Sequence, residues 1–315
     1  MPRRPNDTAP IPRVALPAVA LARHHPETVV REQVRSGRWE RVARGIYLPT
    51  TPSPDPSRDR EVALARIVGV HDRLDAPHWF SHVSAALLWG LPVWASPTTT
   101  HLYRAHGAGI DSDRRVTSHT SVPPAAELAA IGTLPVTTLE RTVVDCASGL
   151  PPLAGLVIAD SALRAGADVG VIDSIVEARS VRRGIARARA VIALADGGAE
   201  SPGESATRFV VLRDGLPVPT TQIAVPTRLG VFWSDLGWPQ WRLLLEYDGR
   251  SKYSDAASEQ FMREKRRHDA VVEAGWRALR VTKEDLTGST LTRRILPLLP
   301  AEVRVGLLRR RDLMG

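Results

Sequence analysis

Helical spacing of apolar residues near the start of the chain gives way to an alternating pattern. Residues 15–24 and 27–36 are predicted to be short helices, and Gly37 follows the second at the position favoured for a C-cap. Residues 38–49 alternate like a strand, a turn and a strand. Two short helices followed by a basic hairpin predict a winged helix-turn-helix.

Apolar stretches in the middle of the chain predict further helices. Residues 81–92 form a helical pattern whose apolar face ends at Gly90. Residues 134–146 are predicted to begin as an extended segment and to continue as a helix, with Thr137 or Thr138 as the N-cap of that helix. We therefore expect a mixed domain of helices and strands between the N-terminal unit and the rest of the chain.

Residues 155–195 are rich in alanine and predicted to be largely helical, with a break near Gly184. Their basic residues form either a strip that faces phosphates or the solvated face of a connector. These residues are Arg179, Arg182, Arg183, Arg187 and Arg189. A last helix is expected over residues 301–313.

The final third of the chain predicts the order helix, strand, strand, strand, helix, strand. Ser201 can cap the first helix, which has Glu204 in its first turn. The later elements are a short strand holding Asp235, a turn at 237–240, an apolar strand at 243–245, a helix at 258–274 and a strand at 276–282.

The apolar strand ends in Glu246, Tyr247 and Asp248. Because side chains alternate across a strand, Glu246 and Asp248 project to one face and Tyr247 to the other. An antiparallel hairpin sets Asp235 beside Glu246. Carboxylates brought together repel each other unless a cation neutralises them, and oxygen ligands suit Mg²⁺ or Mn²⁺. The alternative is that these acids are solvated at the open end of the hairpin.

Cationic side chains follow the acids. Lys252 stands six residues after Glu246, within reach of a phosphate or of a water held at a metal. Arg263 and Arg267 are spaced four apart on one face of the next helix, where they can clamp flanking phosphates.

The element order, with acids at Glu204, Asp235 and Glu246, resembles the restriction-endonuclease-like or PD-(D/E)XK nuclease fold. Residues 201–286 resemble the uncharacterised bacterial family related to very-short-patch-repair (Vsr) endonucleases. The residues that carry this resemblance are the Glu204 helix, Ser234 and Asp235, Glu246 to Gly249, Lys252 and Tyr253, Arg263, Arg267, and Gly275 to Arg277.

This resemblance implies a magnesium-dependent endonuclease that hydrolyses DNA. Asp235 and Glu246 would hold one Mg²⁺ or Mn²⁺, with Glu204 or Asp248 completing the shell directly or through water. Asp248 stands where the fold usually has a lysine, so Lys252 is expected to orient the attacking water.

The front half of the chain resembles a second family. Residues 36–47 resemble the N-terminal domain of AbiEi-type antitoxins, and residues 81–92 and 134–146 resemble that family's second domain. Because AbiEi-type proteins repress their own toxin–antitoxin operons, DNA and a cognate toxin are the implied partners. The arginines expected on a groove or on phosphates are Arg31 and Arg35 from the second helix and Arg38, Arg41 and Arg44 from the wing. A degenerate winged helix that serves only for packing is the alternative.

These patterns predict an α+β or α/β multidomain protein with a C-terminal αβββαβ core. The expected parts are a disordered arm at 1–12, a winged-helix-like domain at 13–50, an AbiEi-like domain at 59–165, a basic helical connector at 166–199 and a nuclease-like domain at 200–315.

Composition gives moderate support to a polyanionic partner and excludes a few other classes of site. The 315 residues include 42 Lys and Arg against 34 Asp and Glu, a net charge of +8 that suits a polyanionic partner. Cys146 is the single cysteine, which excludes an intramolecular disulfide and a cysteine-based zinc site and fits a reducing cytoplasm. No apolar run approaches the roughly 20 residues of a membrane span.

Other candidate chemistry is rejected at this stage. Ser81, His82 and Ser84 are not expected to form a nucleophile and base, because contacts on a helix run three or four residues apart. The remaining central histidines lack ligand spacing and are expected to be solvated or satisfied: His101, His106 and His119. Cys146 is expected to be a buried structural thiol.

The sequence thus favours a DNA-binding, Mg²⁺-dependent phosphodiester hydrolase linked to defence or to toxin–antitoxin systems. The alternative is an AbiEi-like DNA-binding regulator whose nuclease fold is an inactive scaffold. A protein-binding adaptor without nucleic acid is the third possibility.

Overall fold

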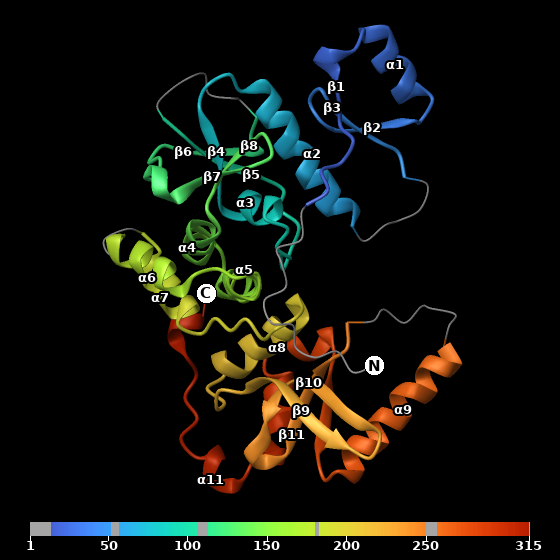
Figure 1. Ribbon diagram of the computed structural model, residues 1–315, viewed down its shortest axis with the longest axis vertical. Helices are drawn as coiled ribbons and strands as arrows, with labels where there is room; N and C mark the ends of the chain where they lie inside the picture. Colours follow the sequence, from blue (N-terminus) through green and yellow to red (C-terminus); the bar gives the residue numbers. More distant parts are fainter. Residues whose placement is uncertain (1–13, 52–56, 106–112, 180–182, 250–256, 315) are drawn as a thin grey trace.

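The computed structural model describes residues 14–51, 57–105, 113–179, 183–249 and 257–314. The chain is a mixed α/β protein of several parts, with three sheets of three, five and four strands (Figure 1). In the described part of the chain, no helix has the length and apolar character needed to cross a bilayer.

The first sheet is small and antiparallel, with strand order β1-β3-β2. Its elements are β1 (Ala20–Leu21), the 3-10 turn η1 (Ala22–His24), α1 (Glu27–Arg35), β2 (Trp39–Ala43) and β3 (Ile46–Pro49). The second predicted helix is therefore confirmed as α1, and Gly37 follows it with φ 70°. The predicted hairpin is confirmed as β2 and β3.

The helix predicted over residues 15–24 is wrong. Pro17 interrupts that segment, and proline cannot donate the backbone hydrogen bond that a helix interior needs. The chain instead pairs with β3 at Ala20↔Tyr47, and the Ala22 N–H donates to the Gly45 carbonyl at 2.9 Å. Sheet pairing thus replaces the helix that apolar spacing alone indicated.

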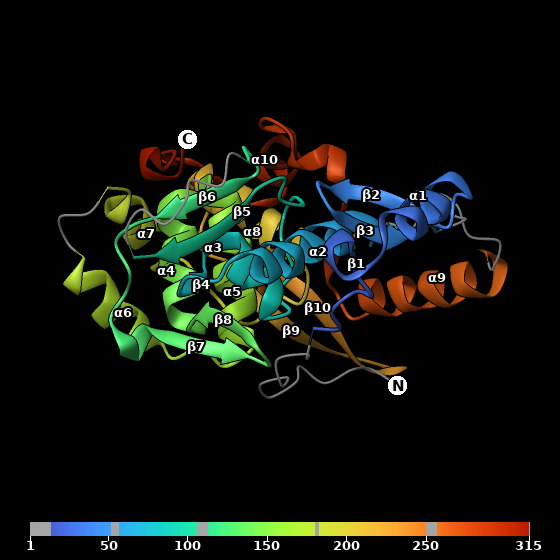
Figure 2. The same ribbon diagram turned by 90° about the horizontal axis from the view of Figure 1, so that it is seen from above.

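The second sheet is mixed, with strand order β6-β5-β4-β8-β7. Its elements are α2 (Arg58–Arg73), β4 (His78–Phe80), α3 (His82–Leu88), β5 (Thr100–Arg104), β6 (Val116–His119), η2 (Ala125–Glu127), β7 (Leu128–Ile131) and β8 (Leu134–Thr137). Helix α2 lies between the first and second sheets (Figure 2). Its Ala65 packs with Ile46 and Leu48 of the small sheet, while its Leu64 and Ile67 pack on the five-stranded one.

A bundle of helices continues from this sheet: α4 (Leu139–Gly149), α5 (Pro152–Arg164), α6 (Val169–Ala178) and α7 (Ile185–Ile192). Thr138 caps α4 by accepting from the Arg141 N–H at 3.2 Å, which confirms one of the two predicted caps. Gly184, with φ 81°, separates α6 from α7 as expected. Cys146 is fully buried in this bundle, as predicted.

The third sheet contains the expected element order. Its elements are α8 (Pro202–Arg213), β9 (Thr220–Thr227), β10 (Gly230–Trp238), the turn η3 (Pro239–Trp241), β11 (Leu243–Tyr247), α9 (Ala257–Glu273) and β12 (Arg277–Val281). The strand order is β12-β11-β10-β9, with β11 and β12 parallel and the other pairs antiparallel.

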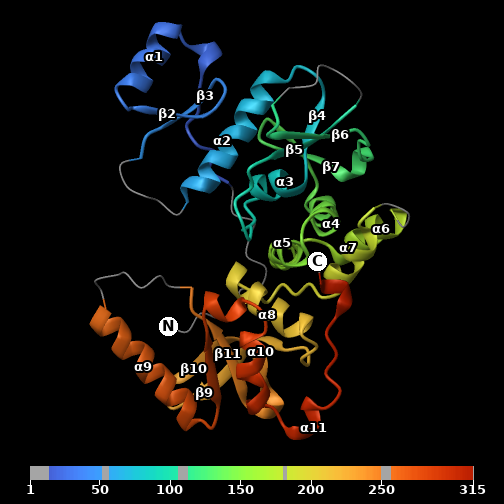
Figure 3. The ribbon, with the colours of Figure 1, turned by 180° about the vertical axis from the view of Figure 1, so that it is seen from behind.

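Helices α8 and α9 cover opposite faces of this sheet (Figures 1 and 3). Leu243 and Leu245 of β11 pack with Val210 and Val211 of α8, whereas Leu244 between them packs with Val271 of α9. This alternation is what a strand buried on both faces requires.

Helix α8 is buried on all sides, because it also packs against α5. Phe209 and Leu212 belong to the core of the helical bundle, and Val210 and Val211 to the core of the third sheet. The guanidinium of Arg208 lies 2.5 Å from Asp160 of α5, and both side chains are almost fully buried. Helix α8 therefore joins the two cores.

The C-terminal segment departs from the prediction. After the turn η4 (Lys283–Leu286) come α10 (Thr290–Ile295), η5 (Leu296–Leu298), α11 (Ala301–Arg304) and η6 (Arg311–Leu313). The helix expected over residues 301–313 is wrong beyond Arg304, because Val305 is extended and Gly306 has φ 83°. The chain then returns to the bundle, where Leu313 is buried.

Candidate functional site

The carboxylate of Asp235 lies where β10 and β11 stop pairing. The ladder between these strands ends at Leu236↔Leu245, and beyond it the Tyr247 N–H donates to Asp235 Oδ2 at 2.7 Å. The hairpin therefore sets Asp235 beside the end of β11, as the sequence predicted.

Glu204 reaches the same region from the first turn of α8. Its N–H donates to the Ser201 hydroxyl at 3.2 Å, its Oε1 accepts from that hydroxyl at 2.9 Å, and its Oε2 accepts from the Glu200 N–H at 2.7 Å. The Ser201 hydroxyl therefore caps α8, which confirms the predicted cap, and the Glu204 side chain also bonds the amide just before it. Gly203 allows the close approach of the sheet, because a Cβ there would lie 1.9 Å from Tyr247 Cε1.

Glu246 is held from the α9 side of the sheet. Its Oε1 accepts from Arg267 Nη2 at 3.0 Å, and the same nitrogen donates to the Trp233 carbonyl at 2.8 Å. The Arg267 guanidinium also lies 5.6 Å from the ring centroid of Phe232. Arg267 is thereby fixed next to the acids, one helical turn from the exposed Arg263.

The three acids interact electrostatically. The pKa of Asp235 is raised to about 7, first by burial and then by the charges of Glu204 and Glu246, against the opposing effects of the Tyr247 amide and Arg267. Burial likewise raises the pKa of Glu204. Each carboxylate therefore disfavours the ionised form of Asp235, and a nearby cation would relieve that cost.

The donor set fits a hard divalent cation. Among the described residues, these three acids do not form a group whose ligand atoms all lie within 4.8 Å of one another. An ion here would therefore have fewer than three direct protein ligands and keep several waters, as Mg²⁺ usually does. Asp235 and Glu246 are the candidates for direct contact, and Glu204 for contact through water.

The other predicted members of the acidic site have different surroundings. Asp248 Oδ2 lies 3.3 Å from Arg280 Nη1 of β12. Lys252 lies outside the described residues, so its predicted role stays a prediction. A pocket of about 420 Å³ on the α9 side of the sheet is lined by Glu246, Glu264, Lys265, Arg267, His268, Asp269, Val271, Ala278 and Arg280.

The five arginines of the N-terminal unit that are predicted to contact DNA are all exposed: Arg31, Arg35, Arg38, Arg41 and Arg44. Two of them make exposed ion pairs, Arg31 with Glu27 at 2.6 Å and Arg38 with Glu32 at 3.7 Å. Exposed pairs contribute about 0.2–1 kcal/mol, so a phosphate can replace the carboxylate at little cost.

A second basic feature was missed at the sequence level. A pocket of about 780 Å³ lies where β1, β2 and β3 meet α2 and the residues before β6. Its charged lining is Arg23, Arg41, Arg44, Arg73, Arg114 and Arg115 with Asp72 and Asp113, so six positive charges face two negative ones. Only the tertiary fold brings these distant residues together.

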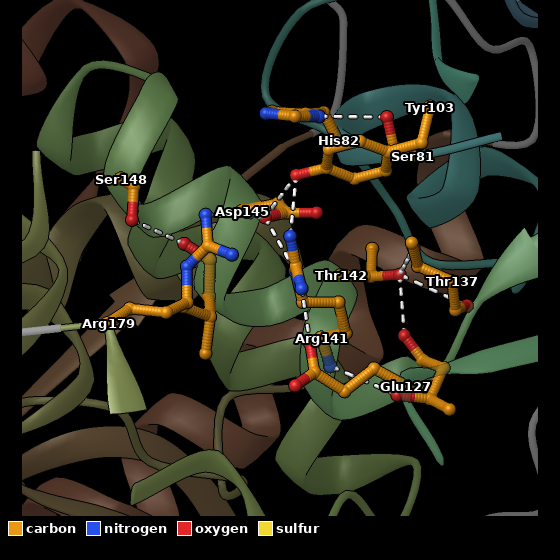
Figure 4. Close-up of polar contacts among 12 residues, drawn as sticks. Ser81, His82, Tyr103, Glu127, Thr137, Arg141, Thr142, Asp145, Ser148 and Arg179 are labelled. Atoms are coloured by element: carbon orange, nitrogen blue, oxygen red, sulfur yellow. Dashed lines mark hydrogen bonds and ion pairs between the residues drawn. The ribbon is translucent and has the colours of Figure 1, made fainter. Parts of the chain in front are cut away.

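The middle domain contains a buried ionic network (Figure 4). Arg141 Nε donates to Asp145 at 2.8 Å, its Nη1 to Glu127, and its Nη2 to the Tyr103 hydroxyl at 2.7 Å. That hydroxyl donates in turn to Asp145 at 3.0 Å, and Arg179 lies 3.8 Å from the same carboxylate. The network leaves Arg141 only 1% exposed.

Two sequence-based rejections concern residues beside this network. The structure overturns the geometric reason given for the first, although not its conclusion, and the lack of ligand spacing expected in the second. Ser81 Oγ lies 2.9 Å from His82 Nδ1, because Ser81 is extended and His82 has φ 51° rather than helical geometry. Ser81 is fully buried and is therefore inaccessible as a nucleophile. His101 and His119 lie beside His82, and one ring nitrogen of each of the three lies within 4.8 Å of the other two. His106 lies outside the described residues.

No family model matches the chain. Two uncharacterised proteins of Mycobacterium tuberculosis, Rv2248 of strain H37Rv and MT2308 of strain CDC 1551, are each 34% identical to it over 148 residues, which is 46% of this chain. The chain spans about half the length of these curated relatives, 54% in each case.

Among solved structures, the chain is similar to the RV2827C protein from Mycobacterium tuberculosis. The TM-score is 0.37 at 16% sequence identity, and the match covers 60% of this chain and 75% of that one.

Proposed function

We propose that the chain is a DNA-binding protein whose C-terminal αβββαβ part, read as a restriction-endonuclease-like core, hydrolyses phosphodiester bonds with a divalent cation. The observation that supports this proposal is that the carboxylates of Glu204 and Glu246, from α8 and β11, lie near enough to Asp235 on β10 to raise its pKa, beside the fixed guanidinium of Arg267. An acidic group that only capped a hairpin would be exposed, whereas Asp235 is half-buried with a strongly raised pKa.

The chain's own residues have distinct roles in this proposal. Asp235 and Glu246 bind the cation, and the Tyr247 amide fixes the orientation of the Asp235 carboxylate. Arg267 exchanges its contact with Glu246 for one with a DNA phosphate, and Arg263 binds the adjacent phosphate. A bound Mg²⁺ or Mn²⁺ would supply a water of lowered pKa and neutralise charge on the phosphate.

A plasmid-nicking assay with Mn²⁺ or Mg²⁺ tests the enzymatic part. The informative variants are Asp235→Asn and Glu246→Gln, which are nearly isosteric, with Asp173→Asn as the matched control because Asp173 is an exposed aspartate on α6. We expect the first two to reduce nicking more than about 100-fold, the upper end of what a lost outer-shell metal partner costs, and the control to be unchanged. Equal activity in all four proteins would exclude this site.

The second candidate is an AbiEi-like DNA-binding regulator with a winged helix and a cognate toxin. The basic pocket where the first sheet meets α2 favours it. Six positive charges face two negative ones there, and these residues are remote in sequence from the acids. Duplex DNA binding that weakens steeply with salt, in a protein that nicks no plasmid, would support the regulator and contradict the nuclease.

A further inference from the structure

Three histidines from three elements meet above the buried ionic network of the middle domain. His101 is on β5, His119 ends β6, and His82 begins α3. Within the described residues, they are the one group of histidines, cysteines and acids whose ligand atoms all lie within 4.8 Å of one another. None of them takes part in the proposed nuclease site.

Strand register explains why two of the histidines are neighbours. In the parallel pair β5 and β6, Tyr103 is the Cα partner of His119. His101 precedes Tyr103 by two residues and therefore projects from the same face of the sheet. His101, Tyr103 and His119 thus form one cluster at the edge of that face.

Backbone contacts bring the third histidine to the cluster. The Ser81 N–H donates to the His101 carbonyl at 3.0 Å, and the His101 N–H donates to Ser84 Oγ at 2.9 Å, which fixes the start of α3 against β5. His82 adopts φ 51°, in the left-handed region that residues other than glycine rarely occupy. Such strain concentrates at functional sites, and here it accompanies stacking of the His82 ring on His119, with centroids 4.2 Å apart.

The nitrogen distances suit a metal ion. His101 Nδ1 and His119 Nε2 are 3.2 Å apart. Two imidazole nitrogens bound to one tetrahedral Zn²⁺ are separated by about 3.3 Å, given Zn–N bonds of about 2.0–2.1 Å. On metal binding, the His82 ring would rotate out of its stack on His119, which would bring a His82 ring nitrogen toward the other two nitrogens. Ser81 Oγ, 2.9 Å from His82 Nδ1, can accept a hydrogen bond from that nitrogen and so leave Nε2 as the ligand atom.

The surroundings can accept a cation. All three histidines are half-buried, so an ion has access to them. The two nearby guanidiniums, Arg141 and Arg179, are matched by Asp145 and Glu127. Burial also lowers the pKa of each histidine, which keeps the imidazoles in the neutral form that binds metals.

We propose that His82, His101 and His119 bind one transition-metal ion of the kind that prefers imidazole, such as Zn²⁺ or Co²⁺. Three protein ligands leave a coordination position for water or for a ligand atom from outside. The site is independent of the hard-cation site at Asp235 and Glu246.

The test is a Co²⁺ titration of the untagged full chain after removal of metals with a chelator. We expect visible ligand-field absorption of four-coordinate Co²⁺ that saturates at about one equivalent and is displaced by Zn²⁺. His101→Gln and His119→Gln should each weaken binding more than about tenfold. Zn²⁺ should also raise the Tm of the unsubstituted protein by about 5 °C at saturating concentration.

Two controls separate this site from its alternatives. His71→Gln alters a second histidine pair, in which His71 Nδ1 lies 2.9 Å from His78 Nε2, and should leave Co²⁺ binding unchanged. Asp235→Asn should also leave Co²⁺ binding unchanged. The histidine proposal can therefore hold even if the nuclease proposal fails. Lack of stoichiometric Co²⁺ and Zn²⁺ binding would show that the histidines only hydrogen-bond to one another. An equal loss of Co²⁺ affinity in His71→Gln and His119→Gln would also overturn the proposal.

Discussion

The histidine cluster of the middle domain and the acidic cluster of the C-terminal sheet respond to burial in opposite ways. Burial lowers the pKa of His82 to about 2 and of His101 to about 4, so these imidazoles are neutral and ready to bind a metal at pH 7. Burial raises the pKa of Asp235 to about 7, so that carboxylate keeps a proton part of the time. Burial therefore favours the deprotonated, metal-binding form of the histidines and disfavours the deprotonated, metal-binding form of Asp235.

The clusters also differ in how their neighbouring arginines are held. Arg141, below the histidines, is 1% exposed and paired with Asp145, which is equally buried. Arg267, beside the acids, is 31% exposed and its partner Glu246 is 25% exposed. The first arginine therefore belongs to a closed structural network, whereas the second can exchange its carboxylate for a phosphate.

The largest expected effect is on stability. Arg141→Met leaves the Asp145 carboxylate buried without its main partner, and we expect it to reduce the free energy of unfolding by about 3–5 kcal/mol. Arg267→Met breaks a half-exposed pair and should cost about 1 kcal/mol. Urea unfolding at pH 7, followed by circular dichroism, measures both.

Arg164→Met is the matched control for this contrast. Arg164 pairs with Glu200 at 2.9 Å, with side chains 22% and 26% exposed, so its loss should resemble that of Arg267. A cost for Arg267→Met as large as that for Arg141→Met would show that the acidic cluster is as closed as the histidine network.

The second effect concerns the pH dependence of metal binding. Because a proton competes for Asp235 below its pKa of about 7, Mn²⁺ affinity at the acids should fall up to about tenfold per pH unit below pH 7. Co²⁺ affinity at the histidines should fall less steeply over the same range, because burial lowers the pKa of His101 to about 4 and of His82 to about 2, and lowers that of His119 as well. Calorimetric titrations at three pH values distinguish the two slopes, and identical slopes would contradict the comparison.

A smaller effect follows from the sign of the Asp235 shift. The pKa of Asp235 is raised above its unfolded value of 3.8, so the cost of ionisation is absent below about pH 4 and complete above about pH 7. Asp235→Asn should therefore raise the free energy of unfolding by about 1 kcal/mol at pH 8 without metal, and the gain should shrink as the pH falls toward 4. Thermal unfolding at pH 8 and 4 measures it; destabilisation at pH 8 would mean that the Tyr247 contact outweighs the repulsion.

The smallest effect tests the basic surface. Arg44 is exposed and lines the basic pocket, so Arg44→Ala should weaken duplex DNA binding modestly and reduce the slope of log affinity against log salt by about 0.9 if it contacts one phosphate. Arg187→Ala on α7, whose Nη1 donates to the Leu150 carbonyl at 3.2 Å, serves as a control outside that pocket. An unchanged salt slope in Arg44→Ala would exclude the phosphate contact.

Local patterns predicted the features that depend on neighbouring residues. Alternation around Leu244 gave the strand and its two faces, and the Ser201 and Thr138 caps followed from helix-start chemistry. The pairing of Asp235 with the end of β11 was also accessible, because a hairpin with a short turn constrains its register.

Features that depend on distant contacts could not be predicted in this way. Residues 15–24 have helical spacing, but pairing with β3 and the presence of Pro17 determine their structure. His82, His101 and His119 meet only because β5 and β6 pair in parallel and α3 docks on β5. The available signal was the alternation of His101 with Tyr103, which placed both on one face of a strand.

Helix α8 sets a limit on how the protein can be divided. Expression of residues 200–315 alone would expose Phe209 and Leu212 to solvent and leave the Arg208 guanidinium without Asp160. Such a fragment should aggregate or collect in inclusion bodies, although its sheet would be intact. Activity measurements on residues 200–315 alone would then report the behaviour of a damaged fragment, so inactivation should be introduced by point substitution in the full chain.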